Sequence, residues 1–458
     1  MEVFENPATV ASDAGDARFA RLLFGGPAFA RLCGALLLLS IPFQTLPFQE
    51  AFGIQTLPLT TVFALLFAPF FIRRIPRSPV LTCVTAFVVF AVAHSAVLLG
   101  VHLLQGESDL RIAGWLRQLF ALACGFATFF VFRQTILHLS DSDVSKYLVA
   151  GLIPSFALAL LNVAWGAFDQ QWAGAIVAGV RRFLSPIGHT AAMRASAFTV
   201  EPAAFATTVI ITMLPVFLSE EYSRPLRFRT AVLAIVALLS VGWTFSSSAL
   251  IIMTGTLFTG MVIGPRKGTI LAVFLVGVGF FALFVALFPS NQIVRHATSL
   301  AFGLQNVSFS DRFYGSLGPF VSILRAPTLV GYGLGGISTH LAELIPRRVI
   351  AEVVEVRAVP NIASLLGRAF AETGIIGFTL LVLALGMTFR ELRTVIRHAP
   401  TQSERTYAMA VRLAMAAVLI STFMTIGPYH TPFFWLWIAA ADARYVAITR
   451  RHAAPNGV

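Results

Sequence analysis

Long runs of apolar residues, separated by short polar segments, dominate the chain. A helix needs roughly 20 residues to cross the hydrocarbon core of a membrane, and only helices or closed barrels satisfy the backbone there. These runs are too long and too continuous for barrel strands. The pattern predicts an all-α, polytopic membrane protein of about twelve spans, near 28–47, 56–72, 79–100, 114–132, 147–166, 196–218, 229–244, 246–263, 269–289, 363–388, 408–427 and 431–447.

Basic residues gather at both ends of the chain and in the even-numbered connections between spans. Examples are Arg74 after the second span, Arg133 and Lys146 around the fourth connection, and Arg266 and Lys267 after the eighth span. Cytoplasmic connections of membrane proteins carry an excess of lysine and arginine. The distribution therefore predicts that both termini are cytoplasmic and that the number of spans is even.

Composition supports a membrane location. Of 458 residues, 57% are hydrophobic and 12% are charged, and the mean hydropathy is +0.81. Soluble domains carry about 25% charged residues. The net charge of +12 lies in clusters beside the apolar runs, which indicates topology and argues against a nucleic-acid partner. The three cysteines form no Cys-x-x-Cys pair, so neither a disulfide framework nor a metal site is expected.

Two longer connections are predicted on the side opposite the cytoplasm, at about 167–195 and 290–362. Neither is set off by a linker, so residues 1–458 are interpreted as one membrane domain in which 290–362 forms a large loop between the ninth and tenth spans. On the cytoplasmic side, Asp141-Ser142-Asp143 precede the fifth span and are expected to cap that helix.

Arg194 and Glu201 open the sixth span and are seven residues apart, which is about two helical turns. A carboxylate at the edge of the hydrocarbon needs a partner or water and is often functional; an interfacial ion pair is the alternative. In the large loop, Arg312 lies beside aromatic residues, and a guanidinium group matches phosphate oxygens well. His430, between the last two spans, is a candidate general base or a helix cap.

A glycine-rich segment, Gly331-Tyr332-Gly333-Leu334-Gly335-Gly336, follows in the same loop. No strand–turn–helix pattern surrounds it, so a nucleotide fold is not expected. Because glycine permits positive φ and close backbone approach, the segment suits either a compact loop over a substrate groove or a plain turn. Arg368 and Glu372 in the tenth span are spaced i,i+4 and are suited to pair with each other.

Taken in order, these motifs resemble the O-antigen polymerase and O-antigen ligase superfamily of bacterial envelope glycosyltransferases. The resemblance covers residues 190–440 and rests on short motifs: Arg194 before Glu201-Pro202, then Arg312, then Gly331-Tyr332-Gly333-Leu334-Gly335, then Asn361 before Glu372-Thr373-Gly374-Ile375-Ile376-Gly377. The chain departs from the pattern at Ser246-Ser247-Ser248, which lacks the usual arginine, and at Pro360, where members often have histidine.

The resemblance implies a metal-independent glycosyltransferase of the type C membrane fold, without a cofactor, in the bacterial inner membrane. Its substrate would be an undecaprenyl-pyrophosphate-linked glycan at the periplasmic face, with membrane lipid around it and a chain-length regulator as a candidate partner. Arg194 and Arg312 would bind the pyrophosphate. Glu201 is the first choice for the base that takes the acceptor proton, with His430 second. The predicted substrate-binding residues are Gly331, Tyr332, Gly333, Gly335, Asn361, Arg368 and Glu372.

The Glu-Pro segment favours a polymerase that joins repeat units into exopolysaccharide or O-antigen. An O-antigen ligase, which transfers the glycan to the lipid A core, stays open as an alternative. A transporter or flippase of lipid-linked glycans is another, because twelve spans with both ends inside is a common transporter plan; yet the sequence shows no half-to-half similarity and has an atypically long outer loop. A scaffold without catalysis is the remaining alternative.

Overall fold

The computed structural model describes residues 26–46, 57–72, 75–105, 110–184, 195–199, 201–223, 228–244, 246–263, 267–287, 307–325, 329–337 and 362–453. Within these ranges the chain is all-helical and contains no strand, as the sequence predicts. The helices are α2 (Pro27–Ser40), α3 (Leu59–Phe71), α4 (Pro79–Leu104), α5 (Leu110–Ile136), α6 (Asp141–Phe168), α7 (Gln171–Leu184), α8 (Pro202–Ser223), α9 (Phe228–Gly242), α10 (Ser247–Ile263), α11 (Lys267–Leu287), α13 (Val307–Arg325), α16 (Leu365–His398), α17 (Gln402–Met424) and α18 (Pro432–Ala453).

Membrane-length helices form the centre of the molecule. Among the described residues, α4, α5, α6, α16 and α17 are each long and apolar enough to cross a membrane. Every predicted span overlaps a helix, but several of these helices are short. The structure is therefore that of a multi-pass helical membrane protein, while the count of about twelve spans stays a prediction.

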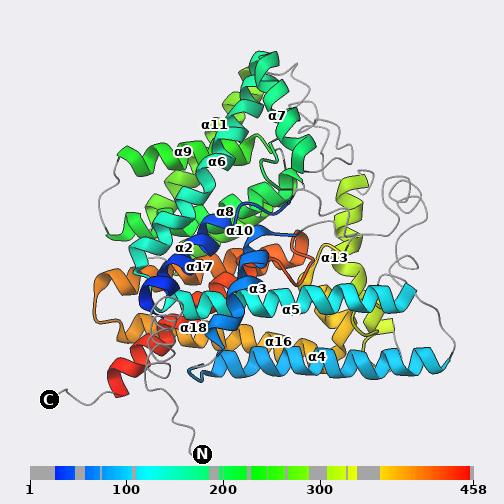
Figure 1. Cartoon of the computed structure of the whole chain (residues 1–458). Coiled ribbons are helices and arrows are strands. Elements are labelled where there is room, and N and C mark those ends of the chain that lie inside the picture. The colour runs from blue at the N-terminus through cyan, green and yellow to red at the C-terminus, as the bar shows by residue number, and fades with distance from the viewer. Residues whose placement is uncertain are drawn as a thin grey trace, which may run out of the picture.

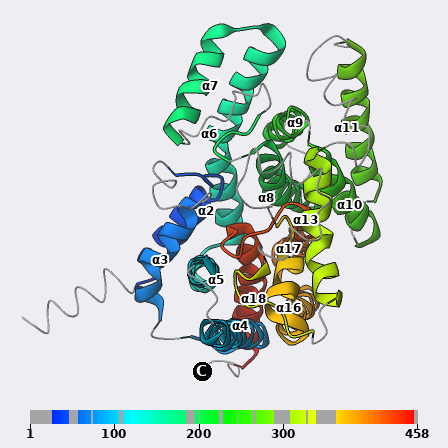
Figure 2. The ribbon, with the colours of Figure 1, turned by 90° about the vertical axis from the view of Figure 1, so that its right-hand side faces the viewer.

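Helices α4, α5, α16 and α18 lie side by side in one half of the molecule (Figures 1 and 2). Their shared core is rich in large side chains from α18, where Trp435 and Trp437 are almost completely buried. Local signals start these helices: the Ser78 side chain accepts a hydrogen bond from the Leu81 amide at 3.1 Å ahead of α4, and Ser364 does the same for Gly367 at 2.9 Å ahead of α16.

A second core joins α6, α7, α8, α9 and α10. Helix α17 connects the two halves, because it packs against α16 on one side and against α8 and α10 on the other. Helix α7 folds back along α6, where Gly174 lets the Trp165 ring approach closely (Figure 1).

The structure adds helices inside both predicted outer loops. Helix α7 lies within 167–195 and α13 lies within 290–362, where α13 packs against α16. Both were expected to be loop, because neither is a continuous apolar run. The described part of 290–362 is thus packed into the helical bundle.

The predicted position of Arg133 is wrong. The sequence assigned it to a polar connection, but it lies on α5, three residues before the helix ends, and its side chain is fully buried. An ion pair with Asp442 of α18 provides the compensation that a buried charge needs. Arg390, Arg393 and Arg397 likewise lie on α16, which continues to His398 instead of ending near 388.

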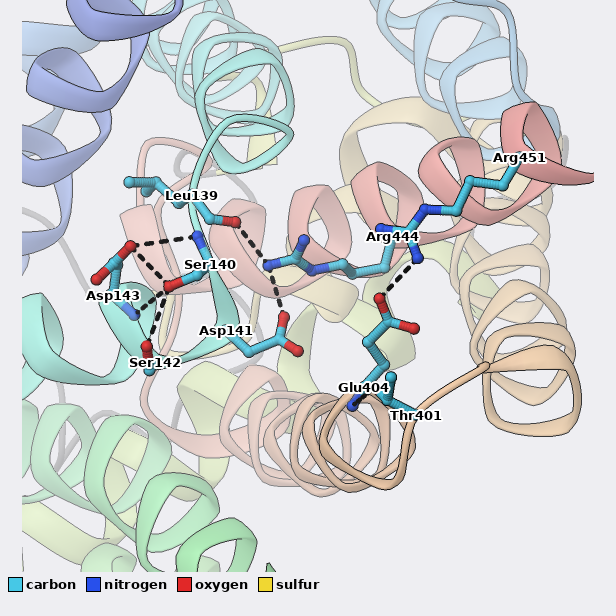
Figure 3. Close-up of polar contacts among 9 residues, drawn as sticks. All are labelled: Leu139, Ser140, Asp141, Ser142, Asp143, Thr401, Glu404, Arg444 and Arg451. Carbon is cyan, nitrogen blue, oxygen red and sulfur yellow. Dashed lines mark hydrogen bonds and ion pairs between the residues drawn. The ribbon is translucent and has the colours of Figure 1, made fainter. Parts of the chain in front are cut away.

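The capping expected before the fifth span is confirmed only in part: Asp143 belongs to a capping box, but Asp141, Ser142 and Asp143 lie inside α6, and the N-cap is Ser140 (Figure 3). The Ser140 hydroxyl accepts a hydrogen bond from the Asp143 amide at 3.2 Å, and the Asp143 carboxylate accepts one from the Ser140 amide at 3.4 Å. Arg444 of α18 then binds the Leu139 carbonyl and the Asp141 carboxylate, at 3.0 and 2.6 Å. This links the start of α6 to α18.

Candidate functional site

Residues 329–337, here called the glycine loop, lie against α4, α5 and α16. The backbone has positive φ at Gly331, Gly333 and Gly335, with values of 94°, 77° and 79°, a region that glycine adopts without strain. A Cβ atom on Gly335 would lie 2.4 Å from the Gly114 carbonyl carbon of α5, and one on Gly331 would lie 2.5 Å from the Gly374 nitrogen. Glycine is therefore required at these contacts.

A break in α16 explains why the loop binds there. Gly374 has φ 64° and ψ −167°, which interrupts the helix. In an unbroken helix the Ala371 and Glu372 carbonyls would accept hydrogen bonds from amides four residues later.

The glycine loop supplies the replacement hydrogen bonds. The Tyr332 amide donates to the Ala371 carbonyl at 2.8 Å, and the Gly333 amide donates to the Glu372 carbonyl at 2.9 Å. In return the Ile375 amide donates to the Leu329 carbonyl at 3.1 Å. The loop and the helix break satisfy each other's backbone groups.

Arg368 and Glu372 form the expected i,i+4 ion pair, with 3.6 Å between Arg368 Nη1 and Glu372 Oε1. The pair is buried, with 8% and 0% of the residues exposed. Glu372 Oε1 also accepts a hydrogen bond from the Gly335 amide at 3.1 Å, and Arg368 Nε donates to the Gly427 carbonyl at 2.9 Å. One arginine and one carboxylate thus join α16, the glycine loop and the segment before α18.

The same end of the bundle contains further polar residues, which the sequence motifs do not include. The Ser95 hydroxyl of α4 accepts a hydrogen bond from the Leu334 amide at 2.9 Å. The neighbouring His94 stacks on Phe90 with 5.4 Å between ring centroids, and both of its ring nitrogens are buried without a hydrogen-bond partner among the described residues. A histidine inside an apolar run was a visible signal, since ionisable groups in membrane spans are often functional.

His430 lies in the segment between α17 and α18, close in sequence to Gly427. Its carbonyl accepts a hydrogen bond from the Thr61 hydroxyl of α3 at 3.4 Å. The adjacent Tyr429 is buried against Phe87 of α4, with 6.4 Å between ring centroids. Through Gly427 this segment contacts Arg368, so His430 belongs to the same end of the bundle as the glycine loop.

Glu201 directly precedes α8 and is half-buried. Its carbonyl accepts the Ala204 and Phe205 amides at 3.1 and 3.2 Å, which begins the helix ahead of Pro202. Arg194 and Asn361 lie outside the described residues, and so does the segment 338–358. For Arg312 only the backbone is described: it lies near the start of α13, whose Phe320 packs on Phe370 of α16 with 5.7 Å between centroids.

The described members of the predicted substrate-binding set are therefore adjacent: Gly331, Tyr332, Gly333, Gly335, Arg368 and Glu372. The backbone of α13 lies beside them. The arrangement offers a rigid backbone surface and a charge-balanced ion pair. Among the described residues, no group of three or more His, Cys, Asp or Glu side chains could hold a metal ion.

Comparison with known protein families finds no family that matches this chain, and comparison with curated protein sequences finds no matching relative.

Proposed function

We propose that this protein is a metal-independent glycosyltransferase that polymerises undecaprenyl-pyrophosphate-linked repeat units at the periplasmic face of the bacterial inner membrane. The observation that supports it best is the contact between two separate motifs of the resemblance. The glycine loop and the Arg368–Glu372 pair, which are 37 residues apart at Gly335 and Glu372, share a hydrogen bond at one end of the bundle.

In the proposed reaction a hydroxyl oxygen of the acceptor glycan attacks the anomeric carbon of the donor. The bond between that carbon and the pyrophosphate oxygen breaks, and the pyrophosphate leaves on its lipid with the bonding electrons. Arg194 and Arg312 stabilise the negative charge of the leaving group without a metal ion. Glu201, or His430 in its place, accepts the proton of the hydroxyl.

Glu372 has a different task in this proposal. Its Oε1 is already engaged by Arg368 and by the Gly335 amide, so it is a positioning residue that holds the loop. The loop in turn shapes the surface on which the sugar and the pyrophosphate bind. Arg368, tied to the Gly427 carbonyl, holds the segment that carries His430.

The test is electrophoresis of lipid-linked and surface glycans from a deletion strain, complemented with wild type, Arg312→Ala or Arg194→Ala. Arg77→Ala is the matched control, because Arg77 is an exposed arginine just before α4. We expect loss of long chains for the two site variants, normal chains for the control, and equal amounts of each protein in the membrane.

The outcomes separate the alternatives. Single repeat units that still reach their final acceptor indicate a polymerase. Long chains that stay on the lipid carrier indicate a ligase instead. A deletion strain with an unchanged glycan pattern would contradict glycosyl transfer and favour a transporter or a scaffold.

A further inference from the structure

At the other end of the central helices, three ionisable side chains meet in the protein interior. Arg133 of α5, Glu391 of α16 and Asp442 of α18 are 0%, 2% and 0% exposed. They lie where α4 begins, where α5 ends, and along α16 and α18, four helices that run side by side (Figure 1). We call these three residues the Arg133 cluster. None of them takes part in the site proposed for glycosyl transfer.

Arg133 holds this cluster together. Its Nε atom forms an ion pair with Asp442 Oδ2. Its Nη2 atom donates to the Pro76 carbonyl at 2.6 Å and lies 3.4 Å from the Ser78 hydroxyl. Glu391 Oε1 accepts a hydrogen bond from the Val80 amide at 3.3 Å. All four helices are therefore connected through these side chains.

The charges in the cluster do not balance. Among the described residues, one guanidinium faces two carboxylates, so full ionisation of all three groups leaves one buried negative charge without a described partner. The Arg368–Glu372 pair, by contrast, has one positive and one negative charge. Burying an uncompensated charge is unfavourable, and a buried carboxylate commonly binds a proton instead.

The hydrogen bonding of the two carboxylates also indicates that one proton is missing. The Glu391 and Asp442 carboxyl groups lie close to each other beside Arg133. A carboxylate has no donor of its own, so two of them can bond only through a hydrogen that one carries. Glu391 Oε2 and Asp442 Oδ1 are buried and have no donor from the described part of the protein. One proton between the two groups removes both the charge imbalance and the missing donor.

We propose that Glu391 and Asp442 share one proton at neutral pH, so that the Arg133 cluster is a buried proton-binding site. The charged and titratable groups that face Glu391 are Arg133 from α5, Asp442 from α18 and the Cys83 thiol from α4. The site links four helices, so its occupancy controls how firmly they pack. This proposal does not depend on the glycosyl-transfer reaction.

The sign of the pH dependence follows from proton binding. The folded protein holds one proton that glutamate and aspartate in the unfolded chain have already released at neutral pH. Above the pH at which the unfolded chain has released this proton, the free energy of unfolding therefore falls as rising pH removes the shared proton from the folded protein. One proton corresponds to a change of up to about tenfold in the unfolding equilibrium for each pH unit.

The experiment uses the purified full chain in lipid nanodiscs. Infrared spectroscopy in H₂O and D₂O detects the carbonyl stretch of a protonated carboxylic acid, and labelling the carboxyl carbons with a heavy isotope identifies it in wild type. We expect this band in wild type and its loss in Glu391→Gln, where the amide replaces the protonated acid. Glu372→Gln is the matched control, because it makes the same change at the balanced pair, and it should keep the band.

Thermal unfolding from about pH 6 to about pH 9 provides a second readout. We expect wild type to lose stability as pH rises and Glu391→Gln to stay nearly constant. Absence of the band from wild type overturns the proposal, even if Glu391→Gln fails to fold. Stability that follows the Na⁺ concentration and not pH also overturns it, because a metal cation then supplies the missing positive charge.

Discussion

The two ends of the central helices solve the problem of buried polar groups in different ways. At the glycine-loop end, backbone amides and carbonyls satisfy one another, and the single ion pair is electrically balanced. At the other end, side chains make most of the contacts, and two carboxylates face one arginine. A balanced, backbone-lined end is suited to hold a shaped surface, whereas an unbalanced cluster of carboxylates is suited to bind a proton.

The largest effect is expected from breaking the ion pair of the Arg133 cluster. Asp442→Ala removes the ion-pair partner of Arg133, and Glu391, whose Oε1 accepts the Val80 amide, replaces it only in part. The free energy of unfolding should therefore fall by up to about 3–5 kcal/mol. Denaturant unfolding in mild detergent measures this loss. Replacing both partners by apolar residues, Arg133→Met with Asp442→Leu, should recover part of the stability. A loss below about 1 kcal/mol for the single variant would show that the charge is not desolvated.

A glycine substitution tests the opposite end. Gly335→Ala adds a Cβ that meets the backbone at Gly114 and places alanine at φ 79°, so we expect a loss of about 2–4 kcal/mol. Gly100→Ala in α4 is the control, because no atom lies within 4 Å of its added Cβ. The control should be neutral or slightly stabilising. A Gly335→Ala variant as stable as the Gly100→Ala control would mean that the loop does not pack tightly.

Glu372→Gln separates charge from shape at that end. The amide oxygen can still accept the Gly335 hydrogen bond, but the charge that balances Arg368 is lost, so we expect a loss of about 1–3 kcal/mol. If Glu372 positions the loop, glycan chains should shorten without disappearing. Complete loss of polymer from a normally expressed variant would instead point to direct participation of the carboxylate in the reaction.

The smallest effect is expected at the surface pair between Arg451 and Glu404, which are 2.8 Å apart (Figure 3). The Arg451 side chain is 59% exposed, so Arg451→Ala should cost less than about 1 kcal/mol. Arg444→Ala should cost more, because that arginine is largely buried and holds both Leu139 and Asp141. Thermal midpoints of the two variants provide the comparison, and the reverse order would contradict it.

Several features were predictable from local sequence. Apolar runs located the helices, and Ser140 begins α6 with its own side chain. The alternating glycines at 331, 333 and 335 indicated positive φ, which the backbone has. Helix ends were less predictable: α16 continues to His398 because its polar last turns pack against neighbouring helices, with Glu391, Leu392 and Val395 buried. Helices α7 and α13 were missed because they are not continuous apolar runs.

The sequence by itself determined the helical class, the membrane location and the glycine positions where the backbone must turn, because each depends on neighbouring residues and on hydrophobicity. Only the tertiary structure decided which charges meet. Arg133 and Asp442 are 309 residues apart, and their pairing follows from how α5 docks on α18. The replacement of helix hydrogen bonds by the glycine loop has the same origin, since a broken helix specifies unmet backbone groups but not the segment that satisfies them.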